Sequence, residues 1–128
     1  PEEIAATYQR IRGPFNVNGL AVAAGMASIR DADFLTKSRD HNSEWRTRMT
    51  EALNAMGLPT PQSDANFILP DFGTAERASG ANDFLKARSI LVRAVGGYDL
   101  PSRLRITVGS AEDNQAVLAA LSDFTASH

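Results

Sequence analysis

Two arginines embedded in apolar runs are the residues of this sequence with the most distinctive chemistry. Arg93 follows the run Ile90–Val92, and Arg105 lies between Leu104 and Ile106. A guanidinium fork suits a planar or trigonal anion such as a carboxylate or a phosphate. An arginine in a strand can also lie on a solvated sheet face or pair with a nearby Asp or Glu. The residues alone leave both interpretations open.

The runs around the two arginines predict a pair of strands. Leu104, Ile106 and Val108 alternate with Arg105 and Thr107, and a period of two is typical of a half-buried strand. A loop with Gly-Gly and Leu-Pro separates the two runs, so we expect the strands to pair antiparallel. The leucine, isoleucine and valine then face a core, and the arginine and threonine face the other way.

Other catalytic chemistry has little support in the sequence. The motifs G-x-S-x-G, G-x-x-x-x-G-K-[ST] and H-E-x-x-H are absent, and there is no cysteine to serve as a nucleophile or metal ligand. Lys37 and Lys86 occupy polar positions on expected helices, so we expect them to be solvated charges. His41 has no cysteine or second histidine nearby, so no metal site and no catalytic role is predicted for it.

Length and composition predict a single soluble domain. The chain has 128 residues, 43% of them hydrophobic, and a net charge of −2, which argues against nucleic acid as a partner. No apolar run approaches the roughly 20 residues that cross a bilayer, and no signal peptide is visible. The lack of cysteine fits a reducing compartment, so we expect a cytoplasmic protein. Because the sequence begins at Pro1 within a helical pattern, we expect it to be a piece of a longer protein.

The first part of the chain predicts two helices of different character. Residues 2–12 read as the end of a helix that Gly13-Pro14 stops, and Asn18 is a good N-cap for the next helix. Residues 19–30 are small or apolar on every side, and such a helix must be buried on every side. A domain of this size does not contain enough protein to cover it.

Three further helices carry apolar stripes. They are expected at about residues 33–56, 75–88 and 111 onward, the last one capped by Ser110. The stripes consist of Leu35, His41, Trp45, Met49, Leu53 and Met56 in the first, Ala78, Ala81 and Leu85 in the second, and Val117, Leu118, Leu121 and Phe124 in the third. A short strand over Asn66–Leu69 lies between the first two. This order predicts an α+β fold, a small antiparallel or mixed sheet of about three strands with helices packed on one face.

An ordered series of motifs then gives the chain a familiar appearance. Arg-Gly-Pro-Phe-Asn-Val-Asn over residues 12–18 heads the alanine-rich helix. Gly-Leu-Pro over 57–59, Ala-Asn-Phe-Ile-Leu over 65–69, Ile-Leu-Val-Arg over 90–93 and Leu-Arg-Ile-Thr-Val-Gly over 104–109 follow in order. The series resembles the C-terminal region of the fold-type I, pyridoxal-phosphate-dependent class I/II aminotransferases, and within them it is most similar to histidinol-phosphate aminotransferases. It covers essentially the whole chain.

The resemblance implies a particular domain organisation. Residues 1–18 would be the end of a helix and a linker from a large domain, and residues 19–128 would form the small C-terminal domain. The large domain, outside this chain, would hold pyridoxal 5'-phosphate and the lysine that forms its Schiff base. The chain alone would then contain no catalytic, cofactor-binding or metal-binding residue and would be inactive. The full-length enzyme would be a homodimer with no nucleic-acid or membrane partner.

The resemblance also implies substrate-binding roles. Arg105 matches the position of the family that binds the substrate anion, and Arg93 matches a second arginine that helps to hold the phosphate of histidinol phosphate. Asn66 follows a family pattern and is a possible cleft residue without an assigned contact. Ser89 departs from the glycine expected before the strand, which bears on the geometry of the turn more than on chemistry.

The sequence leaves several functions open. The main hypothesis is a transferase of histidine biosynthesis that exchanges an amino group between histidinol phosphate, with its keto form imidazole acetol phosphate, and glutamate, with 2-oxoglutarate. The alternatives on the same fold are an aromatic-amino-acid aminotransferase and a threonine-phosphate decarboxylase. An alternative of another class is a free-standing module that binds small anions.

Overall fold

The computed structural model describes residues 1–13 and 15–127 of the chain, so the helix stop expected at Pro14 lies outside the described residues. The chain divides into two compact units, Pro1–Ser38 and Arg39–His128. The boundary expected at residue 18 does not coincide with this division and stays a prediction.

The first unit contains helices with no buried side chain. Helix α1 spans Glu2–Ile11 and α2 spans Gly19–Arg30, and neither contains a buried residue. Asn18 caps α2 as expected, because its Oδ1 accepts a hydrogen bond of 2.8 Å from the amide of Ala21. Large apolar side chains therefore stay exposed in this unit; they include Ile4, Ile11, Val17, Leu20, Met26, Ile29 and Phe34.

Helix α3 spans Ala32–Ala55 and continues from the first unit into the second. Trp45, Met49 and Leu53 are buried on one face, four residues apart, as the apolar stripe predicts. The expected extension of that stripe to Leu35 is wrong, because Leu35 lies in the first unit and is 53% exposed. Gly57 adopts a φ of +77° just beyond the helix, the left-handed geometry expected of a stop.

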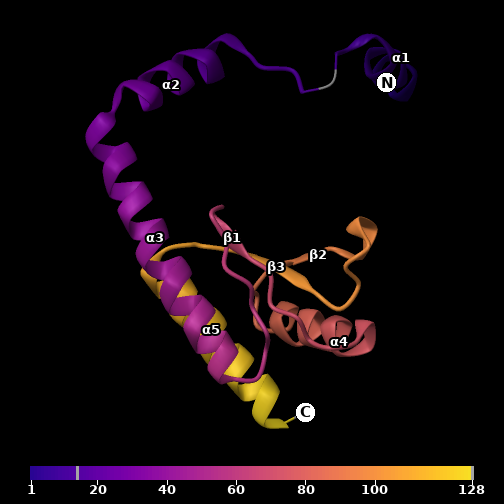
Figure 1. Ribbon diagram of the computed structural model, residues 1–128. Helices are drawn as coiled ribbons and strands as arrows, with labels where there is room; N and C mark the ends of the chain where they lie inside the picture. The colour runs from indigo at the N-terminus through magenta and orange to yellow at the C-terminus, as the bar shows by residue number, and fades with distance from the viewer. Residues whose placement is uncertain (14, 128) are drawn as a thin grey trace. The chain divides into compact units, whose positions relative to one another are not determined.

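The second unit is built on an open sheet of three short strands (Figure 1). Strand β1 spans Phe67–Ile68, β2 spans Arg93–Ala94 and β3 spans Leu104–Thr107. β3 lies in the centre and pairs antiparallel with both neighbours. This confirms the predicted antiparallel pairing of the two runs that carry the arginines.

The start of β2 corrects the sequence prediction. The apolar run Ile90–Val92 lies before the strand, which begins only at Arg93. Helix α4, Ala75–Lys86, ends in a tight turn where the amide of Ile90 donates a hydrogen bond of 3.0 Å to the carbonyl of Leu85. Ser89 has a φ of +61° in this turn, the region that glycine adopts without strain. The turn holds Ile90 at the helix end, so it is not available to the ladder.

The helices of this unit cover one face of the sheet. α4 and α5, Ala111–Ser127, lie with α3 on one side of the sheet (Figure 1). Leu104 and Ile106 of β3 belong to the core that these helices form. The core consists of α3 residues Trp45, Met49 and Leu53, α4 residues Ala78, Ala81 and Leu85, α5 residues Val117, Ala120, Leu121 and Phe124, and sheet residues Ile68, Leu104 and Ile106, with Leu58 and Phe72 from loops. The expected α+β layer with one covered sheet face is confirmed. The other face carries Arg105 and Thr107.

Candidate functional site

The uncovered face of the sheet brings the two expected arginines together. Arg93 of β2 lies directly opposite Arg105 of β3 in the antiparallel register. Side chains in such a pair point to the same face, with Cβ atoms about 4.5–5.5 Å apart. Like charges on directly opposite residues destabilise a sheet. An anion between the two guanidiniums would reverse the sign of this interaction.

Arg105 is held on this face by packing. Its side chain is half-buried, and its guanidinium carbon lies 5.4 Å from the centre of the Phe67 ring. This distance is within the range of a cation–π contact. The Nε of Arg105 is buried and has no hydrogen-bond partner among the described residues. A buried donor without a partner is costly, and an acceptor supplied by a ligand would satisfy it.

Arg93 is more exposed and is steadied by a tyrosine. Its Nη2 donates a hydrogen bond of 3.0 Å to the hydroxyl of Tyr98, and its guanidinium carbon lies 5.6 Å from the tyrosine ring. Tyr98 ends the 3₁₀ turn Gly96–Tyr98 between β2 and β3. Tyr98 is not among the site residues that the sequence predicts. The only indication in the sequence was that an aromatic residue lies in the loop between the two strands that carry the arginines.

In the part of the chain that the structure describes, a third arginine, Arg103, forms an ion pair with a carboxylate, in contrast to Arg93 and Arg105. The Nε of Arg103 lies 3.2 Å from Oδ2 of Asp71. The backbone N–H of Gly73 lowers the pKa of Asp71 most, and hydrogen bonds from Ser102 and Arg103 lower it further against the effect of burial. Within the described residues, neither Arg93 nor Arg105 has a carboxylate within ion-pair distance. Among the described residues, the ion-pair interpretation is therefore not met for these two arginines.

Asn66 lies at the end of the same ladder, apart from the arginine pair. It precedes β1, and its carbonyl accepts a hydrogen bond of 2.9 Å from the amide of Val108. Phe67 pairs with Thr107 and shares its face with Arg105. Because side chains alternate along a strand, Phe67 rather than Asn66 is the β1 residue on the arginine face. A substrate contact of the Asn66 side chain stays a prediction.

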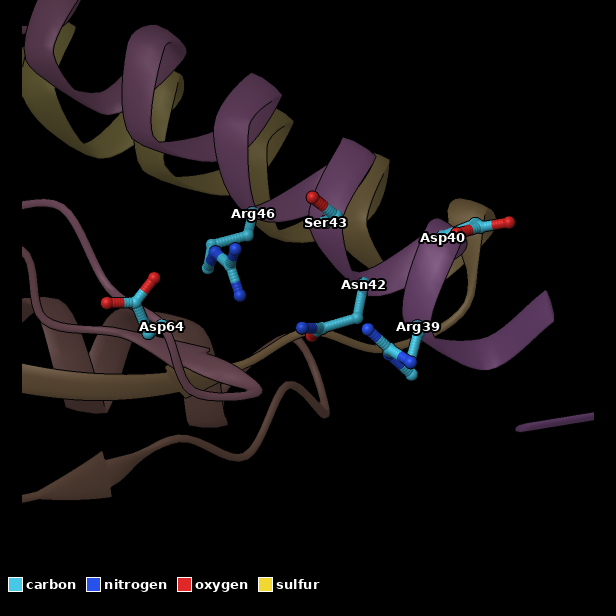
Figure 2. Close-up of a pocket in the computed structure, with 6 residues that line it drawn as sticks. All are labelled: Arg39, Asp40, Asn42, Ser43, Arg46 and Asp64. Atoms are coloured by element: carbon cyan, nitrogen blue, oxygen red, sulfur yellow. The ribbon is translucent and has the colours of Figure 1, made fainter. Parts of the chain in front are cut away.

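A polar hollow lies near this end of the sheet, between α3 and the segment before β1. It has a volume of about 350 Å³ and is lined by Arg39, Asp40, Asn42, Ser43, Arg46 and Asp64. Figure 2 shows that Asn42 and Arg46 extend from α3 on the side of the strand segment that carries Asp64. Two guanidiniums and two carboxylates line it, so its charge is balanced, in contrast to the arginine face.

The described residues also bear on metal binding and on membrane spanning. Across residues 1–13 and 15–127, no group of three or more His, Asp or Glu side chains is placed to hold a metal ion. None of the helices in that part of the chain is both long enough and apolar enough to cross a membrane.

Comparison with known proteins defines the class. The family model described as aminotransferase class I and II matches residues 1–121. The chain therefore belongs to the class I and II aminotransferase family. The small α+β layer agrees with the resemblance noted in the sequence.

Individual relatives are more specific. The histidinol-phosphate aminotransferase of Hyphomonas neptunium is 65% identical over 127 residues, covering 99% of this chain and 35% of the relative. That of a Ruegeria species is 43% identical over 98% of this chain and 35% of the relative. The solved histidinol-phosphate aminotransferase of Sinorhizobium meliloti, in complex with pyridoxal-5'-phosphate, is 27% identical with a TM-score of 0.80, covering 98% of this chain and 35% of that one. The chain thus spans about a third of the length of these relatives.

The lysines of this chain do not fit the covalent anchor of that cofactor. Lys37 of α3 is exposed, and the exposed Nζ of Lys86 lies 3.3 Å from Oδ1 of Asp83. A lysine that forms an imine is desolvated or placed near another cation. An exposed amine next to a carboxylate is the opposite environment. Neither environment favours imine formation, and an imine-forming lysine outside this chain stays a prediction.

Proposed function

We propose that this chain is the substrate-binding small domain of a pyridoxal-phosphate-dependent aminotransferase, and that the full protein acts on histidinol phosphate. The observation that carries the proposal is the direct opposition of Arg93 and Arg105 without a carboxylate partner among the described residues. The 65% identity to a relative named histidinol-phosphate aminotransferase supports the choice of substrate.

The role of this chain would be to bind and orient the anionic end of the substrate. A phosphate accepts hydrogen bonds from two guanidiniums better than a single carboxylate does, because it offers more acceptor oxygens and more charge. Arg105, packed on Phe67, would provide the fixed contact, and Arg93, held by Tyr98, the outer one. In the second half of the reaction the same face would receive glutamate or 2-oxoglutarate. Pyridoxal phosphate, held outside this chain, would supply the electron sink for amino-group transfer.

The wider setting belongs to the same proposal. The full protein would be a cytoplasmic homodimer of histidine biosynthesis, with a large domain that carries the cofactor and its lysine. An aromatic-amino-acid aminotransferase or a threonine-phosphate decarboxylase would use the same fold and the same arginine face. A free-standing anion-binding module would use the face without chemistry. The substrates of these alternatives differ in whether they carry a phosphate for Arg93 to bind, so replacing Arg93 distinguishes between them.

The test compares Arg93→Ala with the wild-type full-length protein on three substrates: histidinol phosphate, threonine phosphate and an aromatic amino acid. We expect kcat/KM for histidinol phosphate to fall about tenfold or more, since a charge-assisted hydrogen bond contributes about 1.5–3 kcal/mol. The aromatic substrate should lose much less, because it has no phosphate. Arg88→Ala is the control, because Arg88 stacks on Phe84 at the end of α4 and lies outside the arginine face.

Three results would contradict the proposal. Equal losses on phosphate-bearing and phosphate-free substrates would make Arg93 a structural residue. A wild-type preference for threonine phosphate, with release of carbon dioxide, would favour the decarboxylase. Anion binding with no turnover of any amino substrate would favour the binding module.

A further inference from the structure

The open end of the β1/β3 ladder is held by side chains of two different helices. Extending the register of Phe67 with Thr107 places Ala65 opposite Gly109, just beyond the last paired residues. The backbone between them is already bonded, since Val108 donates to the carbonyl of Asn66. At Ala65 and Gly109, therefore, the segments that continue β1 and β3 leave the sheet.

Three side chains of α3 bind the carbonyls of this pair. Arg46 donates from Nη1 to the Ala65 oxygen at 3.1 Å, and Asn42 donates from Nδ2 to the same oxygen at 3.3 Å. His41 lies with Nε2 2.9 Å from the Gly109 oxygen. A carbonyl only accepts, so the imidazole donates from Nε2. One helix thus holds both strands at the same level of the ladder.

Helix α5 completes the arrangement from the other side of Gly109. The Oδ1 of Asn114 accepts from the Gly109 amide at 2.8 Å, and its Nδ2 donates to the Gly109 oxygen at 3.1 Å. Asn114 is 1% exposed, so its amide cannot turn to water. A Cβ on Gly109 would lie 3.1 Å from the Cβ of Asp113, so the close approach of α5 favours glycine here. We name His41, Asn42, Arg46 and Asn114 the ladder-end clamp.

The clamp matters because the strands are short. β1 has two residues and β3 has four, so few ladder bonds define their register. A slip of one residue would turn every β3 side chain to the opposite face. Arg105 would then point into the core, and Leu104 or Ile106 would replace it on the open face. A fixed register at Gly109 is what keeps the guanidinium where an anion can reach it.

We propose that the ladder-end clamp is a set of positioning residues: it fixes the register of β3 against β1 and thereby presents Arg105 on the open face. The use of histidinol phosphate as the ligand in the test rests on the proposed function, whereas the claim that the clamp fixes the register of β3 does not. Arg46 and Asn42 also line the polar hollow of Figure 2, so these two side chains of the clamp border that hollow.

The first arm of the test measures backbone protection without substrate. In the full-length protein, His41→Ala and Asn114→Ala should each accelerate amide hydrogen exchange at Val108 and Gly109 about tenfold, and exchange at the buried positions Leu53 and Leu121 should stay unchanged. His41→Gln should restore most of the protection, because its side-chain amide can donate to the same carbonyl. Arg48→Ala is the matched control on α3, since the interactions described for Arg48 are its ion pair with Glu44 and its stacking on the Trp45 ring, both within the helix.

The second arm is a double-mutant cycle on the dissociation constant of histidinol phosphate. His41→Ala should weaken binding about fivefold in the wild-type background and have no effect in Arg105→Ala, because it acts through that arginine. Additive losses would show a merely structural role and overturn the proposal. Unchanged exchange at Val108 and Gly109 in both variants would overturn it as well. If the wild-type protein does not bind histidinol phosphate, the proposed function fails, and the exchange arm alone decides the clamp.

Discussion

Asp71 and Arg103 join the entry to β3 to the loop before α4 through an ion pair of 3.2 Å and an isolated antiparallel bridge between the same two residues. Both side chains are partly shielded from solvent, with 25% and 31% of their surface exposed. Gly73 donates from its backbone to Oδ1 of the same carboxylate at 2.9 Å. The arrangement stabilises the ionised form of Asp71 in the folded state.

The first prediction is a stability contribution that depends on pH. The pKa of Asp71 is lowered on folding, chiefly by the Gly73 N–H, whereas an unfolded aspartate titrates near about 3.9. The contribution is therefore fully present above about pH 5 and is lost as the pH falls through the lowered pKa of the folded state. Denaturant unfolding of the wild type and of Asp71→Asn should give free energies that differ at pH 7, and the difference should shrink as the pH falls below about 4 towards the lowered pKa of the folded state.

A matched variant separates this effect from general charge changes. Asp83 forms an exposed ion pair with Lys86 on α4, and Asp83→Asn should change stability by less than about 1 kcal/mol at any pH. Glu76, whose pKa is lowered by its own backbone N–H and by Thr74, is retained in every variant and cancels from the comparison. A difference between wild type and Asp71→Asn that stays constant from pH 7 to pH 3 would rule the charge effect out.

The second prediction concerns Ser89. Its φ of +61° costs an L-residue about 1–2 kcal/mol in strain. Glycine does not have this strain, but it loses more conformational entropy on folding, so only part of the strain energy is gained by the substitution. Ser89→Gly should therefore raise the free energy of unfolding by about 0.5–1 kcal/mol. Ser122→Gly on the exposed face of α5 is the control and should lower it by about 0.5 kcal/mol. Urea titrations of the three proteins decide the matter, and destabilisation by both glycines would refute the strain argument.

Features that depend only on a residue and its near neighbours in the chain could be predicted from the sequence. Asn18 and Gly57 mark helix ends through their own chemistry, and the four-residue spacing of Trp45 and Met49 identifies the buried face of α3. These features follow from a residue and its near neighbours, so they could be predicted. The alternation around Arg105 likewise predicted the two faces of β3.

The contacts that hold the candidate site were not local. His41 had no partner in the sequence because its partner is the carbonyl of Gly109, 68 residues away, and a backbone acceptor has no residue type to recognise. Tyr98 was missed for a related reason, since its contact with Arg93 depends on how the intervening loop turns. β2 begins only at Arg93 because of the turn at Ser89. The apolar run Ile90–Val92 gives no indication of the positive φ in that turn.

The third prediction is self-association of the 128-residue chain. Leu20 and Ile29 of α2 are 84% and 81% exposed, and exposed apolar surface of this extent drives association. Leu20→Asp should reduce it without melting α2, because an acidic residue is favourable in the first turn of a helix. Leu91→Asp is the control, since Leu91 is also 84% exposed but lies in the other unit. Sedimentation equilibrium should show weaker association for Leu20→Asp only, and a monomeric wild type would contradict the prediction.

The fourth prediction is that the 128-residue chain alone forms no imine with pyridoxal phosphate at a defined site. Neither lysine is desolvated, and Lys86 is paired with Asp83. Titration with one equivalent of cofactor should give no aldimine absorbance band beyond that of a lysine-containing control peptide. A stoichiometric band that disappears in Lys37→Ala or Lys86→Ala would overturn the prediction and place an anchor within this chain.

The last prediction concerns Arg105 in the full-length protein. Its half-buried guanidinium, packed on Phe67, should make the stronger of the two contacts to the substrate anion. Arg105→Ala should lower kcat/KM for histidinol phosphate by roughly ten- to a hundredfold, since one charge-assisted hydrogen bond is worth about 1.5–3 kcal/mol and each 1.4 kcal/mol is tenfold. Arg105→Lys should recover little, because lysine keeps the charge but loses the planar fork. Steady-state kinetics and circular dichroism of both variants test this together: a folded Arg105→Lys protein with wild-type kcat/KM would mean that the position needs only a positive charge, and the bidentate contact would have to be given up.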